Sequence, residues 1–340
     1  MAKRLAVAAL ALCVVCAGCN KTQNVAARLK TDDAGSGTTP VTITLGFSTN
    51  KEDPRGVASL LFKEEVEQNS NGRITVDIHA DGKLGSDADL IDGVVNDTLD
   101  MTISSAGNFA VYAPEVGISA LPFLFSDFES AWQFMDSPLI QDVDKTLEAF
   151  NIVVLSHFDN GFRCVTTTDR AVNCVADMKG LHIRTPPNQI VMETMAALGA
   201  NPEPYAFNEL KKALKDGLFD SQENPIPIIY NSRLYEEQRC LAITNHSYDA
   251  MPLVIRKSLW DTLGEGDRRI LREAAKKAQD LNRQLVRNQT DAFVSRLHNV
   301  GMTITNPNLH EFALATTRVM DTFSTVYGKE LIHEMKELTQ

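Results

Sequence analysis

The segment 41–79 alternates between strand-like and helix-like patterns. Residues 41–47 alternate β-branched and apolar side chains, residues 55–69 carry an apolar side at helical spacing, and residues 73–79 return to alternation. A strand, a helix and a strand in this order form a parallel pair, because the helix must cross back over the sheet. The sequence therefore predicts an α/β fold in which helices cover a mostly parallel sheet.

The first eighteen residues differ in composition from the rest of the chain. Lys3 and Arg4 precede an apolar run over residues 5–15, and small residues follow. This order is typical of a signal peptide, and the run is too short to span a membrane. We predict a signal peptide over residues 1–18 and export of the mature protein.

Three cysteines lie at the end of this segment. Cys13, Cys16 and Cys19 have the CxxCxxC spacing of metal sites, but export would remove two of them, so we predict no metal site. Residues 17–19 resemble the end of a bacterial lipobox, which predicts a lipid-anchored Cys19 and a flexible tether over 19–40. Cys16 stands where that pattern has an aliphatic residue, so ordinary cleavage and free release remain an alternative.

The charge of the chain limits its partners. It has 33 basic and 44 acidic residues, a formal net charge of −11. Such a surface repels nucleic acid, and we predict no nucleic-acid partner. A carboxylate ligand would need local positive charge to bind here.

Two arginines on neighbouring extended segments, Arg163 and Arg184, can supply that charge. Residues 181–185 lie between Gly180 and Pro186 and alternate between apolar or β-branched side chains and basic ones. This pattern predicts a short strand with Arg184 at its carboxyl end. Open α/β sheets bind ligands at this end of their strands, and the planar arginine fork suits a carboxylate. Position alone also fits a solvated arginine or the partner of a structural acid.

Eight short segments occur in a fixed order along the chain. They are Leu84-Gly85-Ser86, Leu99-Asp100-Met101, Leu121-Pro122-Phe123-Leu124-Phe125, Asn160-Gly161-Phe162-Arg163, Ala176 to Arg184, Leu198-Gly199-Ala200-Asn201-Pro202, Gln222-Glu223-Asn224-Pro225 and Thr244-Asn245-His246. As a set they resemble the DctP-type substrate-binding proteins of tripartite ATP-independent periplasmic (TRAP) transporters. The resemblance runs from about residue 41 to the C-terminus.

This resemblance implies a two-lobed periplasmic binding protein fold. Each lobe would hold a mixed, mostly parallel sheet with helices. The first lobe would comprise residues 41–160 plus about 250–290, and the second 161–249 plus about 291–340. A long helix, which the pattern predicts from Asp267 to about Val300, would run across both lobes.

The resemblance also implies a set of ligand-binding residues. Arg184 would hold the ligand carboxylate with two hydrogen bonds, Arg163 would add charge, and Asn224 would bind the carboxylate or a hydroxyl group beside it. The other implied contacts are polar residues of the first lobe and one aromatic residue, namely Ser48, Asp87, Ser105, Asn108 and Phe207. Without the resemblance these residues fit polar loops, a helix cap, a turn asparagine and a core phenylalanine equally well.

The implied function is that of an extracytoplasmic solute receptor. Its two lobes would close on a small carboxylate, a uronic or other sugar acid, and deliver it to the small and large integral-membrane permease subunits. We expect a periplasmic monomer without cofactor or metal, and not an enzyme, because the sequence contains no catalytic signature. The alternatives are a C4-dicarboxylate or keto-acid receptor, a sensing lipoprotein uncoupled from transport, and a purely structural exported lipoprotein.

Three further cysteines belong to the body of the chain. Cys164 and Cys174 flank a turn-like stretch and could form a disulfide in an oxidising compartment, which would leave Cys240 free. Buried free thiols are the alternative.

Overall fold

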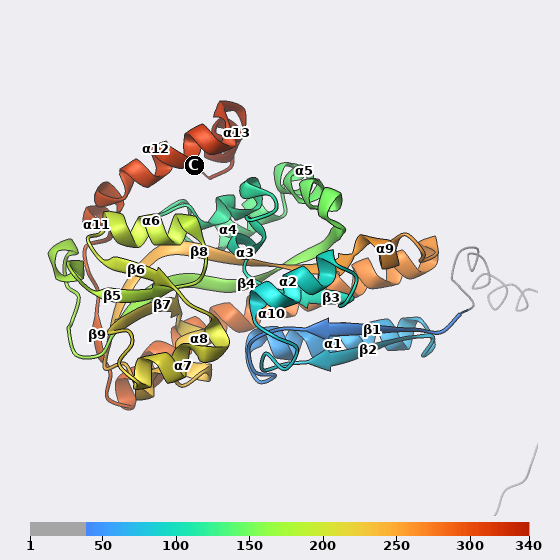
Figure 1. The fold of residues 1–340 in the computed structure, drawn as a ribbon, viewed down its shortest axis with the longest axis horizontal. Coiled ribbons are helices and arrows are strands. Elements are labelled where there is room, and N and C mark those ends of the chain that lie inside the picture. Colours follow the sequence, from blue (N-terminus) through green and yellow to red (C-terminus); the bar gives the residue numbers. More distant parts are fainter. Residues whose placement is uncertain (1–38, 340) are drawn as a thin grey trace, which may run out of the picture.

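The computed structural model describes residues 39–339 (Figure 1). The predicted signal peptide over 1–18, Cys19 and nearly all of the predicted tether lie outside these residues. Within residues 39–339, no helix combines the length and the apolar character needed to cross a membrane.

The strands of this region form one mixed sheet in the order β2-β1-β3-β8-β4-β7-β5-β6, with β9 paired to β8. β1 is parallel to β2 and β3, β5 is parallel to β6 and β7, and β9 is parallel to β8, whereas the pairs β3–β8, β4–β8 and β4–β7 are antiparallel. The strands are β1 (Val41–Gly46), β2 (Ile74–His79), β3 (Met101–Ile103), β4 (Ile152–Thr167), β5 (His182–Thr185), β6 (Asn201–Pro204), β7 (Ser221–Pro225), β8 (Cys240–Arg256) and β9 (Thr303–Thr305).

Helices cover both faces of this sheet (Figure 1). The α-helices are α1 (Pro54–Asn69), α2 (Asp87–Val95), α3 (Ala106–Phe109), α4 (Phe128–Met135), α5 (Pro138–Lys145), α6 (Gln189–Ala197), α7 (Phe207–Lys215), α8 (Ile226–Asn231), α9 (Lys257–Trp260), α10 (Glu265–Asn299), α11 (Leu309–Ala315), α12 (Thr317–Tyr327) and α13 (Lys329–Thr339). Short 3₁₀ helices are η1 (Pro114–Ala120), η2 (Thr146–Phe150), η3 (Val175–Met178) and η4 (Leu234–Glu236).

Two lobes share the sheet. The first lobe contains β1, β2 and β3 at one end, and the second contains β5, β6 and β7 at the other (Figure 1). The strands β4 and β8 run through both, since β3 pairs with the end of β8 at residues 253–255 and β7 pairs with the end of β4 at residues 163–167. The two-lobed α/β fold predicted from the sequence is confirmed, and the predicted residue boundaries of the lobes stay a prediction.

The continuity of β8 corrects one expectation. From the sequence, residues 240–244 and 251–255 are strand-like segments, and residues 245–249 between them are mostly polar. In the structure these polar residues belong to the strand, since β4 pairs with β8 on both sides of them. The paired strands shift register between Val154 and Ser156, between Asp159 and Gly161, and between Arg163 and Val165.

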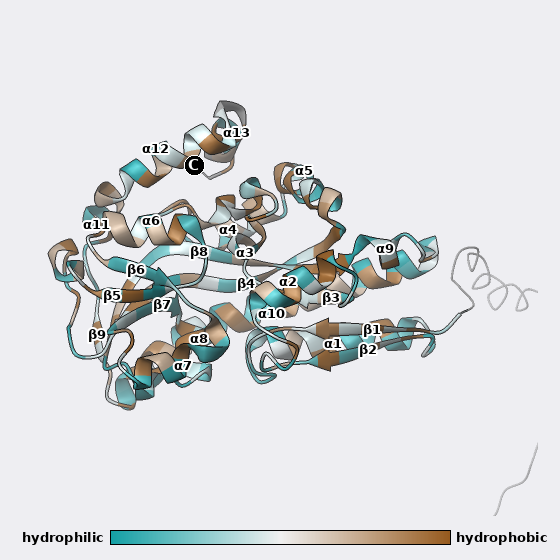
Figure 2. Ribbon diagram, viewed as in Figure 1, coloured by the Kyte–Doolittle hydropathy of each residue, from teal (hydrophilic) through white to brown (hydrophobic). Residues whose placement is uncertain are grey.

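The long helix α10 lies along both lobes, as predicted. Its first half packs against α1 of the first lobe, and its second half packs against α8 of the second. Leu271 and Ala275 enter the core that contains β1 and α1, whereas Phe293 and Leu297 enter the core that contains α7 and α8. The visible parts of α10 in Figure 2 carry both hydrophobic and hydrophilic residues, and its buried residues recur from Asp267 to Leu297.

The last helices cross back over the molecule. α12 packs against α6, and α13 packs against α4 and α5. Ile332 and Met335 of α13 join the core formed by α2, α4 and α5. The end of the described chain therefore contacts helices from two distant parts of the sequence.

The predicted disulfide between Cys164 and Cys174 is not present: both cysteines and Cys240 are free. The side chain of Cys164 enters the core on one face of the sheet, with Leu210 and Phe293. The segment that contains Cys174 packs on the opposite face, where Val172 joins a different core. Because the sheet separates the two thiols, they cannot meet without moving the backbone.

Candidate functional site

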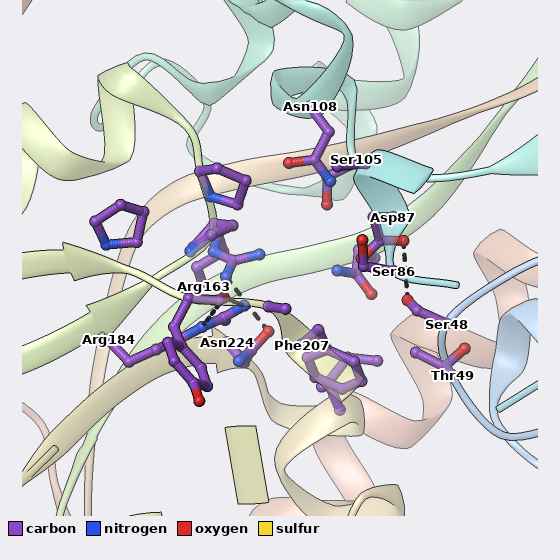
Figure 3. A pocket seen from close by; sticks show the side chains of 18 of the residues that line it. Ser48, Thr49, Ser86, Asp87, Ser105, Asn108, Arg163, Arg184, Phe207 and Asn224 are labelled. Atoms are coloured by element: carbon purple, nitrogen blue, oxygen red, sulfur yellow. Dashed lines mark hydrogen bonds between the residues drawn. The ribbon is translucent and has the colours of Figure 1, made fainter. Parts of the chain in front are cut away.

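A cavity of about 330 Å³ lies between the two lobes. All eight residues that the sequence analysis proposed as ligand contacts line it: Ser48, Asp87, Ser105, Asn108, Arg163, Arg184, Phe207 and Asn224. Figure 3 shows the two arginines and Asn224 on one side, with Ser48 and Asp87 on the other. A volume near 300 Å³ is at the lower end of the range for small-molecule sites.

Arg184 is a buried cation on the second-lobe wall. It lies on β5, is 2% exposed, and donates from Nε and Nη2 to the carbonyl oxygen of Tyr205, at 2.8 and 2.5 Å. The pKa of Arg184 is lowered to about 10, mainly by burial and also by the nearby cation Arg163, against the opposing charges of Glu223 and Asp87. Among the described residues, no carboxylate forms an ion pair with Arg184, so an anion in the cavity would relieve its unfavourable burial.

Arg163 is also buried, but it is paired with two acids. Its Nε and Nη2 bind the carboxylate of Glu223, and its Nη1 donates to Asp249 Oδ2 at 2.5 Å. Nη2 also reaches Asn224 Oδ1 at 3.3 Å. Burial alone would lower the pKa of Arg163, but the charges of Glu223 and Asp249 raise it above its usual value.

Glu223 is the acid at the centre of this network. It is fully buried on β7, and His246 Nε2 lies 3.3 Å from its Oε2. Burial alone would raise the pKa of Glu223, but the adjacent charge of Arg163 holds it below the usual value. Arg163, which lines the cavity, and Glu223, which does not, therefore form a fixed buried ion pair.

Asp249 extends the network toward the first lobe. Its Oδ2 accepts hydrogen bonds from Ser105 Oγ at 2.9 Å and from Asn160 Nδ2 at 2.8 Å, in addition to Arg163. Ser105 follows β3 of the first lobe, whereas Arg163 lies in the second-lobe part of β4. One carboxylate thus links residues on both sides of the cavity.

The first-lobe wall presents oxygen atoms. Ser48 Oγ donates to Asp87 Oδ1 at 2.9 Å, and Asp87 is the first residue of α2, which Ser86 caps. Asn108 Nδ2 donates to Ser104 Oγ at 3.0 Å, and its Oδ1 is buried without a partner in the described structure. These oxygens are suited to accept hydrogen bonds from hydroxyl groups.

Rings and aliphatic side chains form the remaining surface of the cavity. Phe207 is the first residue of α7, and Tyr205 precedes it. The other apolar lining residues are Ala88, Pro186, Pro187, Pro204, Ala206 and Ile228. Such a surface packs against carbon atoms and excludes water from the polar contacts beside it.

Sequence reasoning missed three charged residues of the site. Arg55 lines the cavity from α1, with Nη1 3.2 Å from the carbonyl oxygen of Ile103 and Nε buried without a partner in the described structure. Glu223 and Asp249 do not line the cavity, but both form ion pairs with Arg163. No spacing connects these acids to Arg163 in the sequence, but Glu223 lies within a segment that carried the family resemblance and could have been examined for that reason.

The arrangement can bind an anion that also carries hydroxyl groups. Arg184 supplies an unpaired charge at one end, and oxygen acceptors lie across the cavity. Within residues 39–339, no group of three or more His, Cys, Asp or Glu residues is placed to hold a metal ion.

Comparison with known proteins places the chain in a family. Residues 45–325 match the model of bacterial extracellular solute-binding protein, family 7 (DctP). Uncharacterized protein y4mM of Sinorhizobium fredii (strain NBRC 101917 / NGR234) is 34% identical over 82% of this chain and 52% of that protein. The chain thus spans about half the length of this relative.

Two solved structures have the same fold. A TRAP periplasmic solute-binding protein from Polaromonas sp. JS666, bound to D-erythronate, is 31% identical, with a TM-score of 0.85 over 87% of this chain and 98% of that chain. The sugar acid-binding protein of Advenella mimigardefordensis strain DPN7T, in complex with galactonate, is 27% identical, with a TM-score of 0.86 over 88% and 98%. The chain described here belongs to the DctP family of bacterial extracellular solute-binding proteins, the family of TRAP-transporter receptors.

Proposed function

We propose that this protein is the extracytoplasmic receptor of a TRAP transporter and that it binds a sugar acid between its lobes. The observation that carries the proposal is the state of Arg184. It is a buried guanidinium without an acidic partner among the described residues, and it faces a cavity whose opposite wall presents oxygen atoms. A ligand with one carboxylate and several hydroxyl groups complements both walls.

Each side chain then has a role. The ligand carboxylate binds the Arg184 fork, and Asn224 donates to the carboxylate or to the hydroxyl group beside it. Arg163 adds positive charge and holds Glu223 and Asp249 in place. Hydroxyl groups further along the ligand bind the first-lobe wall, and the carbon chain lies against the ring of Phe207. The first-lobe contacts are Ser48, Asp87, Ser105 and Asn108.

The solved relatives support this ligand class. Those from Polaromonas and Advenella were crystallised with erythronate and galactonate, which are both polyhydroxylated monocarboxylates. The small cavity and the position of Arg184 on its wall fit such a molecule. Which sugar acid binds is decided by how its hydroxyl groups match the first-lobe wall.

The remaining parts of the proposal follow from the family. The receptor is a periplasmic monomer, tethered through a lipid on Cys19, and it delivers its ligand to the small and large membrane subunits. It carries no cofactor and catalyses no reaction. The lobes divide as the sequence predicts, at 41–160 with about 250–290 and at 161–249 with about 291–340.

A C4-dicarboxylate is the second candidate ligand, and Arg55 favours it. This arginine lines the first-lobe wall, so it offers a second cation opposite Arg184. Its Nη1 and Nη2 already contact Ile103 O and Met251 Sδ, which leaves only Nε for a ligand. We therefore rank the dicarboxylate below the sugar acid.

The test is a thermal-shift and calorimetry screen of the refolded protein. D-Erythronate, galactonate, glucuronate, succinate and a keto acid are added separately after a denaturation step that removes any ligand from the host. A ligand at 100 times its Kd stabilises the fold by about 2.7 kcal/mol, a shift of a few degrees. Shifts with the sugar acids alone support the proposal. Shifts with succinate alone support the dicarboxylate receptor, and no shift with any acid contradicts both.

A further inference from the structure

The rim of the cavity contains a close approach between the two lobes. Gly107 lies in α3, directly after β3 of the first lobe, and Asn188 caps the start of α6 in the second lobe. Each of the two residues lies next to a residue that lines the cavity: Asn108 follows Gly107, and Pro187 precedes Asn188. The contact therefore lies beside the cavity, and Ile190 of α6 shares a buried core there with Ala106 and Phe109.

Asn188 is held in a fixed orientation. Its Oδ1 accepts hydrogen bonds from the backbone N–H groups of Ile190, at 2.9 Å, and of Val191, at 3.3 Å. The side chain is 6% exposed. Because Oδ1 caps the helix, Nδ2 must point the other way, toward Gly107, and the amide cannot turn without losing the cap.

Gly107 leaves no room for a larger residue. A Cβ atom built at this position would lie 2.5 Å from Asn188 Cγ, closer still to Nδ2, and 3.2 Å from Asn188 Cβ. Real Cβ atoms do not approach other heavy atoms to 2.5 Å, so either the Asn188 side chain would have to give up its cap or α3 and α6 would have to move apart.

The backbone does not explain the glycine. Gly107 is not in the positive-φ region that favours glycine, and it lies in a helical turn, where alanine is the better residue. A glycine in a helix without a conformational need for it points to a packing reason. The three heavy atoms nearest to such a Cβ all belong to Asn188.

We propose that Gly107 permits closure of the receptor, because only a residue without a side chain lets α3 reach the capped start of α6. A side chain at position 107 would clash with Asn188 and keep α3 and α6 apart. The lobes would still fold, and Arg184 would still be available, but the closed state would be less populated. The ligand-binding part of this inference rests on the proposed function, whereas the closure itself does not.

A second contact across the cavity offers a measurement of closure that needs no ligand. Gly82 follows β2 in the first lobe, and a Cβ at this position would lie 3.3 Å from Asn208 Cβ in α7 of the second lobe. Disulfides form at Cβ separations of about 3.8 Å. The pair Gly82→Cys and Asn208→Cys should therefore oxidise when the lobes close.

The first experiment measures the rate of this oxidation in ligand-free protein, by mobility on a non-reducing gel. Adding Gly107→Ala should slow oxidation by roughly 5- to 150-fold, the range expected from overpacking a filled site. Adding Asn188→Ser as well should restore much of the rate, because serine keeps the helix cap but lacks the amide that blocks Cβ. Circular dichroism must show that every variant is folded.

Three results would overturn the proposal. Oxidation at the original rate in Gly107→Ala shows that position 107 does not limit closure. A slow rate that Asn188→Ser does not restore shows that Asn188 is not the obstacle. No oxidation in the protein that still has Gly107 shows that the two rims do not meet, provided that thermal unfolding shows no loss of stability from the cysteine at position 82, where φ is +62°.

The second experiment measures galactonate binding by calorimetry. Gly107→Ala should raise the Kd by the same factor by which it slows oxidation, and Gly107→Ala with Asn188→Ser should lower it again. Unchanged affinity in a variant that oxidises slowly contradicts the role of closure in binding. If the unsubstituted protein binds no sugar acid, the proposed function fails, and the oxidation rates still decide whether Gly107 permits closure.

Discussion

The guanidinium of Arg184 donates from both Nε and Nη2 to the same backbone oxygen, that of Tyr205. This bond fixes the plane of the guanidinium without neutralising its charge. A carbonyl orients the arginine as a carboxylate would, yet it leaves the positive charge for a ligand. The pairing explains how a protein with a net charge of −11 can present a cation in its binding cavity.

Replacing Arg184 should abolish useful affinity. Loss of one member of a buried, hydrogen-bonded charge pair costs about 3–5 kcal/mol, or roughly two to three and a half decades in Kd. Arg184→Lys should also bind poorly, because a point charge cannot reproduce the fork. Calorimetry with the sugar acid found in the screen checks this. Arg269→Ala, an exposed arginine on α10, is the matched control and should bind normally.

Replacing Glu223 should affect stability more than Arg184→Ala does. Glu223→Gln leaves Arg163 buried with one acid fewer, at a cost of about 3–5 kcal/mol in the free energy of unfolding. Arg184 has no acid partner among the described residues, so its removal should cost the ligand-free protein much less. Urea unfolding without ligand measures both variants. Equal losses of stability in the two variants would contradict this difference between Glu223 and Arg184. Asp216→Asn, which removes an acid from an exposed ion pair, is the control and should leave the free energy of unfolding unchanged.

Asp159 should make the protein less stable as the pH rises from about 4 to 7. Burial raises the pKa of Asp159 to about 7, although Trp132, Arg283 and Tyr248 favour its charged form. In the unfolded chain the group ionises near pH 4, so between these values the unfolded state has lost a proton that the folded state keeps. Stability therefore falls across this window and is constant for this group above it.

Asp159→Asn tests this dependence. The amide cannot ionise, and its oxygen can still accept from Trp132 Nε1, which lies 2.8 Å from Asp159 Oδ2. At pH 8 the variant should be more stable than wild type by up to about 4 kcal/mol, and at pH 4 the advantage should disappear. Urea unfolding at both values, followed by tryptophan fluorescence, measures the difference. A difference that does not change with pH would rule out titration of Asp159.

Reducing agents should not change the melting temperature, because Cys164, Cys174 and Cys240 are free. Burial raises the pKa of Cys164 to about 11, so little thiolate forms there. Iodoacetamide should label the half-buried Cys174 before the two buried cysteines, and peptide mass spectrometry identifies the sites. A peptide that links Cys164 to Cys174 would contradict the structure.

Local patterns were enough to predict most of the secondary structure. The strand over residues 41–47, the helix over 55–69 and the long helix after 267 all appear within a few residues of their predicted bounds. These segments bury one regular face, so their period can be read from the sequence. The Ser86 cap was also predictable, because its two partners are three residues apart.

The central strands were harder to predict because their polar residues resemble a turn. Asp159 is completely buried, and its backbone N–H donates to Asn282 Oδ1 at 2.5 Å. Asn160 binds Asp249 across the sheet. The hydrogen-bond acceptor for the Asp159 N–H lies on α10, more than 100 residues later in the sequence. No local sequence pattern can predict such a distant contact.

In the candidate site, too, local patterns predicted some residues, whereas contacts between distant residues could not be predicted. Arg184 was predictable from the strand that ends beside it and from the prolines that follow. The two acids that hold Arg163 were not, because Glu223 and Asp249 meet it only after the sheet has formed. Sequence reasoning could not tell a free arginine from the partner of a structural acid, whereas in the structure Arg163 pairs with two acids and Arg184 pairs with none of the described ones.

The passage of β4 and β8 through both lobes restricts how this receptor can change its ligand during evolution. Neither lobe can be exchanged as a unit by recombination, because each crossover point would cut a strand that the other lobe needs. A lobe expressed alone would also expose a broken sheet edge to aggregation. New specificity must therefore arise by point substitution on the cavity walls, while the strands that join them stay whole.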